Sequence, residues 1–201
     1  PPLTDALPPP PPLPPAPPPL PTAITLQAFA PPLGAVLELR GPEGEREVPI
    51  EDFYVADGIV NRDIRPSELL VAVRIPAPSA GHLSAYGKLR TRGSIDFPLL
   101  GVACRLDLDG DGTISSADLV FTALQARPLR ARKASQLLEG AAPQSEDFAD
   151  VVTAVAAAAY KQCHPLANIP GDHEYRREMV PVYVKRTLRA ALEGSGPVHH
   201  I

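Results

Sequence analysis

The sequence predicts an α+β fold in which a mostly antiparallel sheet of three to four strands is followed by three helices packed on one of its faces. Two observations predict this class. Between residues 33 and 124, short apolar runs, several of them alternating with polar residues, are separated by Pro, Gly and Asp, as is typical of strands and turns. From residue 128 onward, the apolar residues recur at helical spacing. Strands followed by helices indicate an α+β layer.

The first 32 residues form a proline-rich, low-complexity segment. Residues 1–22 contain thirteen of the 27 prolines, which have no backbone N–H to donate. Such a segment favours extended polyproline II structure and is expected to stay disordered outside the core. One interpretation is a spacer, or sequence foreign to the domain that follows; the other is a ligand for a proline-recognition domain.

Residues 33–63 are predicted to contain one hairpin and a connector. Residues 35–40 alternate between apolar and polar, residues 41–44 (GPEG) form a turn, and residues 45–48 supply the returning strand. Residues 49–54 and 61–68 are predicted to form a polar, turn-rich connector. Because an isolated hairpin is marginally stable in water, we expect this one to belong to a larger sheet.

Residues 64–195 are predicted to form the main domain, and its strands come first. They are expected at 70–75 and 82–92, separated by a turn rich in Pro, Gly and Ser, and then at 99–108 and 114–124. The strand at 82–92 ends in three closely spaced cations, followed by an aspartate: Lys88, Arg90, Arg92 and Asp96. This crowding of charge is the first indication of a site.

An acidic segment joins the last two predicted strands. It places oxygen-bearing side chains at the spacing of a calcium loop of the EF-hand or dockerin kind, with glycine at the sixth position. These side chains are Asp107, Asp109, Asp111, Thr113 and Asp118. However, the residues before the loop alternate like a strand rather than a helix, and the sequence has no second copy. A tight β-hairpin turn, for which Asp-Gly is favoured, is therefore the main prediction, and a calcium-stabilised interaction module is the alternative.

Three helices are predicted after the strands. The first covers residues 128–140, the second covers residues 145–163, and the third begins near residue 172. Pro181 is expected to kink the third helix, because proline removes one backbone hydrogen bond. Residues 196–201 are expected to form a tail.

Composition excludes several classes of protein. A net charge of -4 and a pI near 5.7 argue against a nucleic-acid-binding protein. No apolar run approaches the roughly 20 residues of a membrane span, and the start of the sequence lacks the pattern of a signal peptide. Neither nucleic acid nor a membrane is therefore expected as a partner. Cys104 and Cys163 lie in separate apolar runs without a CxxC motif, so we expect two buried thiols in a reducing cytoplasm.

Several segments, taken in order, carry a family resemblance. They are residues 34–53 (GAVLELRGPEGEREVPIEDF), 65–70 (RPSELL), Ile75-Pro76, 85–88 (AYGK), Arg92, Asp96, 128–131 (PLRA) and 171–177 (GDHEYRR). Their order and spacing resemble the FAD-binding flavoprotein (medium) subunit of molybdenum hydroxylases. That family includes carbon monoxide dehydrogenase, xanthine dehydrogenase and 4-hydroxybenzoyl-CoA reductase.

The resemblance implies that residues 64–195 are the C-terminal domain of such a subunit and that residues 33–63 are the end of its FAD-binding domain. The parent would be an oxidoreductase in which FAD relays electrons between iron–sulfur centres and an external acceptor. Its partners would be an iron–sulfur small subunit and a molybdopterin large subunit. The Gly-rich segments with which the family binds the FAD pyrophosphate have no counterpart here. We therefore expect a truncated or frame-disrupted gene product that does not retain FAD and is not active alone.

The resemblance also suggests roles for particular side chains. Lys88, Arg92 and Asp96 match a loop beside the flavin ring, where fixed positive charge would stabilise the reduced, anionic flavin and the aspartate would orient the cations. From the residues alone, the cluster is a solvated strand end. Tyr175 and Arg176 lie in the first turn of the last helix, where Tyr175 is expected to pack and the arginine to be solvated. The resemblance makes this pair an interdomain anchor, and no catalytic residue is expected.

Overall fold

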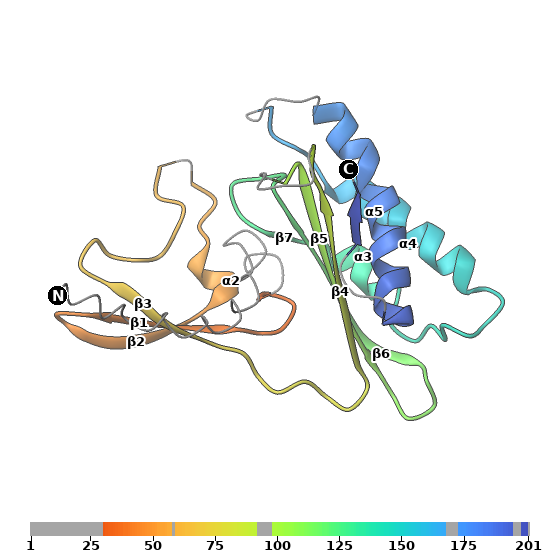
Figure 1. The fold of residues 1–201 in the computed structure, drawn as a ribbon, viewed down its shortest axis with the longest axis horizontal. Helices are drawn as coiled ribbons and strands as arrows, with labels where there is room; N and C mark the ends of the chain where they lie inside the picture. Colours follow the sequence, from red (N-terminus) through yellow and green to blue (C-terminus); the bar gives the residue numbers. More distant parts are fainter. Residues whose placement is uncertain (1–29, 58, 92–97, 168–172, 195–197, 201) are drawn as a thin grey trace, which may run out of the picture.

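The structure, a computed structural model, describes residues 30–57, 59–91, 98–167, 173–194 and 198–200. Its strands form two sheets, one of three strands and one of five (Figure 1). The three-stranded sheet and the helices α3, α4 and α5 lie on opposite sides of the five-stranded sheet. The proline-rich segment up to residue 29 and the predicted site residues Arg92 and Asp96 lie outside the described residues.

The smaller sheet has the strand order β2-β1-β3, and its strands are antiparallel. Its elements are β1 (Val36–Gly41), β2 (Gly44–Pro49), the short helix α2 (Ile50–Phe53) and β3 (Leu69–Arg74). Alternate apolar residues of β1 face a small core that α2 closes. That core includes Leu37, Leu39, Val48, Ile50 and Phe53. The predicted hairpin at residues 35–48 is thus confirmed, and it belongs to a larger sheet as expected.

The larger sheet has the strand order β7-β6-β5-β4-β8. Its strands are β4 (His82–Leu89), β5 (Leu100–Leu108), β6 (Ile114–Thr122), β7 (Leu129–Arg130) and β8 (Val198–His200). All neighbours pair antiparallel except β4 and β8, which are parallel. The mostly antiparallel sheet predicted from the sequence is confirmed, with more strands than the expected three to four.

Three helices cover one face of this sheet, as predicted (Figure 1). They are α3 (Arg132–Gln136), α4 (Phe148–Gln162) and α5 (His173–Glu193). Leucine, valine and aromatic side chains from the strands and helices form one fully buried core between them, including Leu106, Leu119, Phe121, Val155 and Leu188. Gly87 lets α5 lie close to β4, because a Cβ at this position would be 2.5 Å from the Thr187 hydroxyl oxygen.

The two strands expected around the Pro/Gly/Ser turn belong to different sheets. Strand β3 pairs with β1, and Arg74 bonds Glu47 of β2 at 2.9 Å, so β3 lies in the smaller sheet although it follows position 64. The connection from β3 to β4 contains Pro76 and Pro78, which cannot donate to a sheet. The chain therefore leaves one sheet here and enters the other.

Three further segments differ from expectation. Only residues 132–136 of the predicted helix at 128–140 are helical, because Leu129 and Arg130 pair with β6 as β7. The polar connector contains α2, because Ile50 and Phe53 bury their side chains in the smaller core. Residues 198–200 of the expected tail form β8; parallel pairing requires a crossover, and α5 supplies it.

Candidate functional site

Of the three residues predicted beside a flavin, the structure describes Lys88. It is the second-to-last residue of β4 and is only 8% exposed. Ala85 and Leu89 of the same strand pack in the helix-side core, and Gly87 contacts α5. Alternation therefore places Lys88 with Tyr86 on the opposite face, which we call the polar face. The expectation of a solvated cationic strand end is wrong for Lys88.

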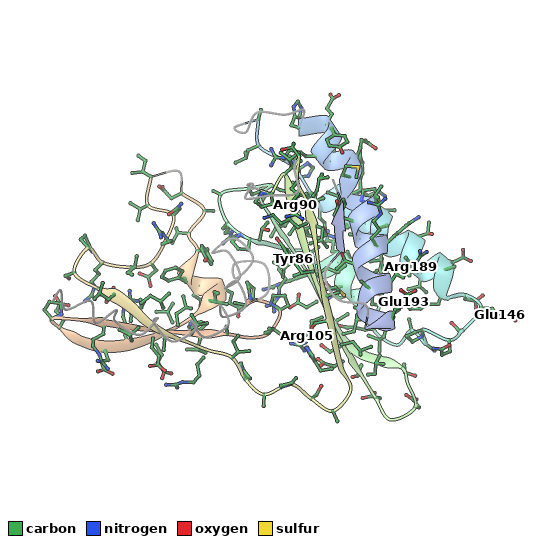
Figure 2. All side chains as sticks on the ribbon, in the orientation of Figure 1. Tyr86, Arg90, Arg105, Glu146, Arg189 and Glu193 are labelled. Carbon is green, nitrogen blue, oxygen red and sulfur yellow. The ribbon has the colours of Figure 1, made fainter. Side chains whose placement is uncertain are left out.

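The polar face is turned toward the smaller sheet. Figure 2 shows Tyr86 and Arg105 on this side of the five-stranded sheet, whereas Arg189 and Glu193 lie with α5 on the other side. The Arg105 guanidinium donates to the carbonyl oxygen of Pro32 at 2.8 Å. Charged side chains of the larger sheet thus hold the segment that leads into β1.

Arg130, which is bound to Asp118 of β6, forms the second contact of the polar face with the smaller sheet. Arg130 Nε lies 2.9 and 2.8 Å from the two carboxylate oxygens of Asp118, whose hydrogen bond raises the pKa of the guanidinium. Arg130 also donates to Glu51 of α2 at 2.6 Å and to the carbonyl of Pro31 at 3.2 Å. Sequence reasoning assigned Asp118 only to the calcium alternative. Alternation along β6 could have placed Asp118 on the polar face, because its neighbours Ala117 and Leu119 pack in the core on the helix side.

A cavity of about 380 Å³ lies beside the contact of Arg130 with Glu51 and Pro31. It is lined on one side by Pro31, Glu51 and Tyr54 and on the other by residues around β7, including Arg130. Because Arg130 is already paired with two carboxylates, its charge is largely neutralised within the protein. Arg127 and Arg132 also line this cavity, so basic side chains besides Arg130 border the space between the sheets.

A second cleft, of about 420 Å³, lies where β4 ends against α5. Its lining includes Arg90 from the end of β4 and Arg186 from α5, together with Leu99 and the aromatic residues Tyr175 and Tyr183. Among the described residues, neither arginine forms an ion pair. Basic side chains therefore lie on both sides of this end of β4: Lys88 on the polar face, and Arg90 and Arg186 at the cleft.

The exposure of Tyr175 and Arg176 is the reverse of what the residues alone predict. Tyr175 is 46% exposed, whereas Arg176 is 1% exposed. The reason is that Arg176 Nε and Nη1 donate to the carbonyl oxygens of Leu99 and Leu166, each at 3.0 Å. Both acceptors belong to the helix-covered unit around the larger sheet, so these contacts do not reach the smaller sheet. The interdomain role of the pair stays a prediction.

The acidic segment is a tight turn between β5 and β6, as the main prediction had it. The Asp109 N–H donates to the Thr113 carbonyl at 2.8 Å, and Asp111 accepts the Thr113 N–H at 2.9 Å. Asp107 instead accepts from Ser79 and Arg105, and these bonds outweigh burial and lower the pKa of its carboxyl group. In the described part of the chain, no three His, Cys, Asp or Glu side chains gather to hold a metal ion.

The cysteines and the long helices bear on the remaining expectations. Cys104 and Cys163 are buried, unpaired thiols, as expected, and burial raises the pKa of Cys163 to about 12. At such a pKa the thiol stays protonated and unreactive at neutral pH. Among the helices of the described residues, none combines the length and apolar character needed to cross a bilayer.

Comparison with known proteins shows which family this chain resembles. The family model of the CO dehydrogenase flavoprotein C-terminal domain matches residues 84–191, more than half of the chain. The carbon monoxide dehydrogenase medium chain of Afipia carboxidovorans is 36% identical over 162 residues, which are 79% of this chain and 52% of that protein. The xanthine dehydrogenase FAD-binding subunit of Escherichia coli O157:H7 is 27% identical over 81% of this chain and 53% of its own length.

A solved structure agrees with these matches. Carbon monoxide dehydrogenase from Hydrogenophaga pseudoflava, in a form lacking the Mo-pyranopterin moiety of its molybdenum cofactor, superposes with a TM-score of 0.72 at 32% identity. The superposition covers 83% of this chain and 55% of that one. The chain thus spans about half the length of the relatives it matches. It belongs to the CO dehydrogenase flavoprotein C-terminal domain family.

Proposed function

We propose that this chain is the C-terminal part of the flavoprotein subunit of a molybdenum hydroxylase-type oxidoreductase. In this proposal the parent subunit relays electrons between iron–sulfur centres and an external acceptor through FAD. The family match and the similarity to a carbon monoxide dehydrogenase medium chain and a xanthine dehydrogenase FAD-binding subunit support it. The partners would be an iron–sulfur small subunit and a molybdopterin large subunit, assembled in the cytoplasm, where the two free thiols stay reduced.

The observation that carries the proposal is the position of Lys88. Lys88 is only 8% exposed, so its ammonium has given up most of its hydration, and a cation in such a place acts strongly on a neighbouring group whose charge changes. Lys88 and Tyr86 place a cation and an aromatic ring on the polar face, a set of groups that fits a planar ring gaining negative charge. FAD, when bound, supplies a ring that accepts and returns electrons.

In this arrangement the residues of the chain act by position and charge. The Lys88 ammonium favours whichever state of its neighbour carries more negative charge, and the limited water around it strengthens that effect. Arg92 and Asp96 remain predicted members of the same flavin-side loop. Arg105 and Arg130 would hold the segment that leads into β1 against the polar face, which also carries Lys88.

The test is a chimaera in which the matched region of this chain replaces the corresponding region of the Hydrogenophaga pseudoflava medium chain. Lys88→Met should lower the flavin midpoint potential, because the reduced form loses a stabilising charge. A loss of about 1.4 kcal/mol corresponds to roughly 30 mV for a two-electron couple. Lys185→Met, which removes an exposed lysine from α5, is the matched control and should leave the potential unchanged.

An unchanged potential in Lys88→Met, accompanied by a melting temperature lowered by many degrees, would contradict the proposal and make Lys88 purely structural. A separate expectation concerns the chain by itself, which should be purified colourless because it lacks Gly-rich segments to bind the FAD pyrophosphate. A flavin absorption band that persists through gel filtration would contradict that expectation and leave the proposed function standing.

A further inference from the structure

Arg176 is a buried cation whose partners, among the described residues, are backbone carbonyls rather than carboxylates. It is 1% exposed, and no carboxylate pairs with it within the described part of the chain. Instead, it donates to three backbone carbonyls: Leu99 through Nε and Leu166 through Nη1, each at 3.0 Å, and Ala123 through Nη2. Burial lowers the pKa of the guanidinium, but arginine stays protonated at neutral pH.

The three carbonyls lie at one end of the five-stranded sheet. Leu99 directly precedes β5, and Ala123 directly follows β6. Leu166 follows α4 and donates its own N–H to the carbonyl of Leu124 at 2.9 Å. Because Leu89 is opposite Leu100, this is also the end at which β4 finishes. One side chain therefore joins three irregular segments at the Lys88 end of the sheet.

The chemistry of the contact explains why arginine occupies this place. The guanidinium offers donors in a rigid planar fork, so it can bond three acceptors that lie in different directions, whereas a lysine ammonium cannot span them. Stability alone does not require a charge here, since well-packed apolar side chains often replace buried ionic groups without loss. The arginine instead fixes the geometry of the segments it joins. Ala123 has a φ of +66°, uncommon for a residue other than glycine, and its carbonyl is one of the acceptors.

We propose that Arg176 is a positioning residue for the flavin-facing end of β4, acting through Leu99. The inference rests on the proposed function, which takes the Lys88 end of β4 to face the flavin. Leu99 is held on both sides: its N–H donates to the Leu89 carbonyl at 2.8 Å, and its carbonyl accepts from Arg176. Leu89 is covalently joined to Lys88. Two hydrogen bonds therefore connect the buried guanidinium to the backbone that carries the cation.

Hydrogen exchange of the full chain tests the first half of the proposal. In Arg176→Lys the charge remains but the fork is lost, so the Leu99 amide should exchange at least about tenfold faster than in the parent chain. The reference is the Ile114 amide, which donates to the Ala141 carbonyl at 2.9 Å at the opposite end of the sheet. Its exchange rate should not change.

A neighbouring arginine provides the matched control. Arg177→Lys alters a half-buried guanidinium that lies 4.4 Å from the centre of the Tyr160 ring, and it should not affect the Leu99 amide. Equal acceleration at Leu99 and Ile114 in Arg176→Lys would mean global destabilisation and would overturn the proposal. So would unchanged exchange at Leu99. Should Arg176→Lys fail to fold, Arg176→Gln, which keeps planar donors, provides the same comparison.

The second half of the proposal is measured in the chimaera through the flavin midpoint potential. Arg176→Lys should shift the potential in the same direction as Lys88→Met, and by less, because the ammonium is displaced rather than removed. If Lys88→Met shifts the potential and Arg176→Lys does not, Arg176 has no positioning role and the proposed function stands. If neither variant shifts the potential while the Leu99 amide is accelerated, the proposed function fails, and Arg176 fixes the strand end for structural reasons alone.

Discussion

The two faces of the five-stranded sheet are stabilised in different ways. The helix-covered face buries leucine, valine and aromatic side chains in one continuous core. The polar face carries Lys88, Arg105 and Asp118 and is held to the smaller sheet and the segment before it by hydrogen bonds and by the ion pair of Arg130 with Glu51. Apolar packing tolerates small shifts, whereas charged hydrogen bonds require defined geometry. The comparison teaches that one face supplies stability and the other fixes where charges lie.

The largest effect is expected on the helix-covered face. Leu119→Ala should cost about 2–5 kcal/mol of unfolding free energy, because Leu119 is fully buried and its removal leaves a cavity. The next residue, Val120, points to the other face and borders the 380 Å³ cavity, so Val120→Ala should cost less. Urea unfolding of both variants gives the difference. Equal costs would show that the two faces contribute to stability in the same way.

A smaller effect is expected from the ion pair of the polar face. Asp118→Asn weakens the contact with Arg130 and should cost about 1.5–3 kcal/mol, the range for hydrogen bonds to charged groups. A double-mutant cycle with Arg130→Met measures the coupling between the two side chains. Arg132→Met, two residues further along and exposed, is the control. A coupling near zero would mean that this pair does not hold the polar face.

In the smaller sheet, the contribution of a charged contact to stability can be measured through its pH dependence. Glu68 accepts hydrogen bonds from Arg46 at 2.8 and 2.9 Å and from the Arg65 N–H, and these lower its pKa from 4.5 to about 2. Because the pKa is lower in the folded state, the resulting stabilisation is complete above pH 4.5 and is lost as the pH falls toward 2. Glu68→Gln should therefore lower the denaturant midpoint at pH 7 and much less at pH 2. A difference that does not change with pH would assign the effect to packing.

The smallest effect is expected from calcium. The turn between β5 and β6 holds Asp109 and Asp111 by local hydrogen bonds, and Asp118 is bound to Arg130. Millimolar calcium should therefore leave the melting temperature nearly unchanged. Saturation at about 100 times the dissociation constant would instead add about 2.7 kcal/mol. A clear rise in melting temperature with calcium, abolished by Asp109→Ala, would contradict the turn assignment.

Alternation and turn chemistry were enough to predict the hairpin of the smaller sheet, strands β4, β5 and β6, and helices α4 and α5. They could not predict that β3 and β4 lie in different sheets, because periodicity describes a strand and not its partner. Strand β8 was missed since three residues show no period. Arg176 was expected to be solvated because charge predicts exposure, and only the fold shows three carbonyls converging on one point. Lys88 was expected from the residues alone to be solvated, because alternation does not show burial; its place beside a flavin stays a prediction.

The contacts of Arg105 and Arg130 with Pro31 and Pro32 have a consequence for the response to ionic strength. Proline has no N–H, so its carbonyl oxygen is the one backbone group that it can offer, and a cation is the partner that such an acceptor favours. A bond between an ion and a neutral dipole acts over a shorter range than a pair of charges, and dissolved salt screens it little at contact distance. The exposed pair of Arg130 with Glu51 weakens in salt, but the two carbonyl contacts persist. We therefore expect the contacts of Arg105 and Arg130 with the segment before β1 to depend less on salt than the pair of Arg130 with Glu51.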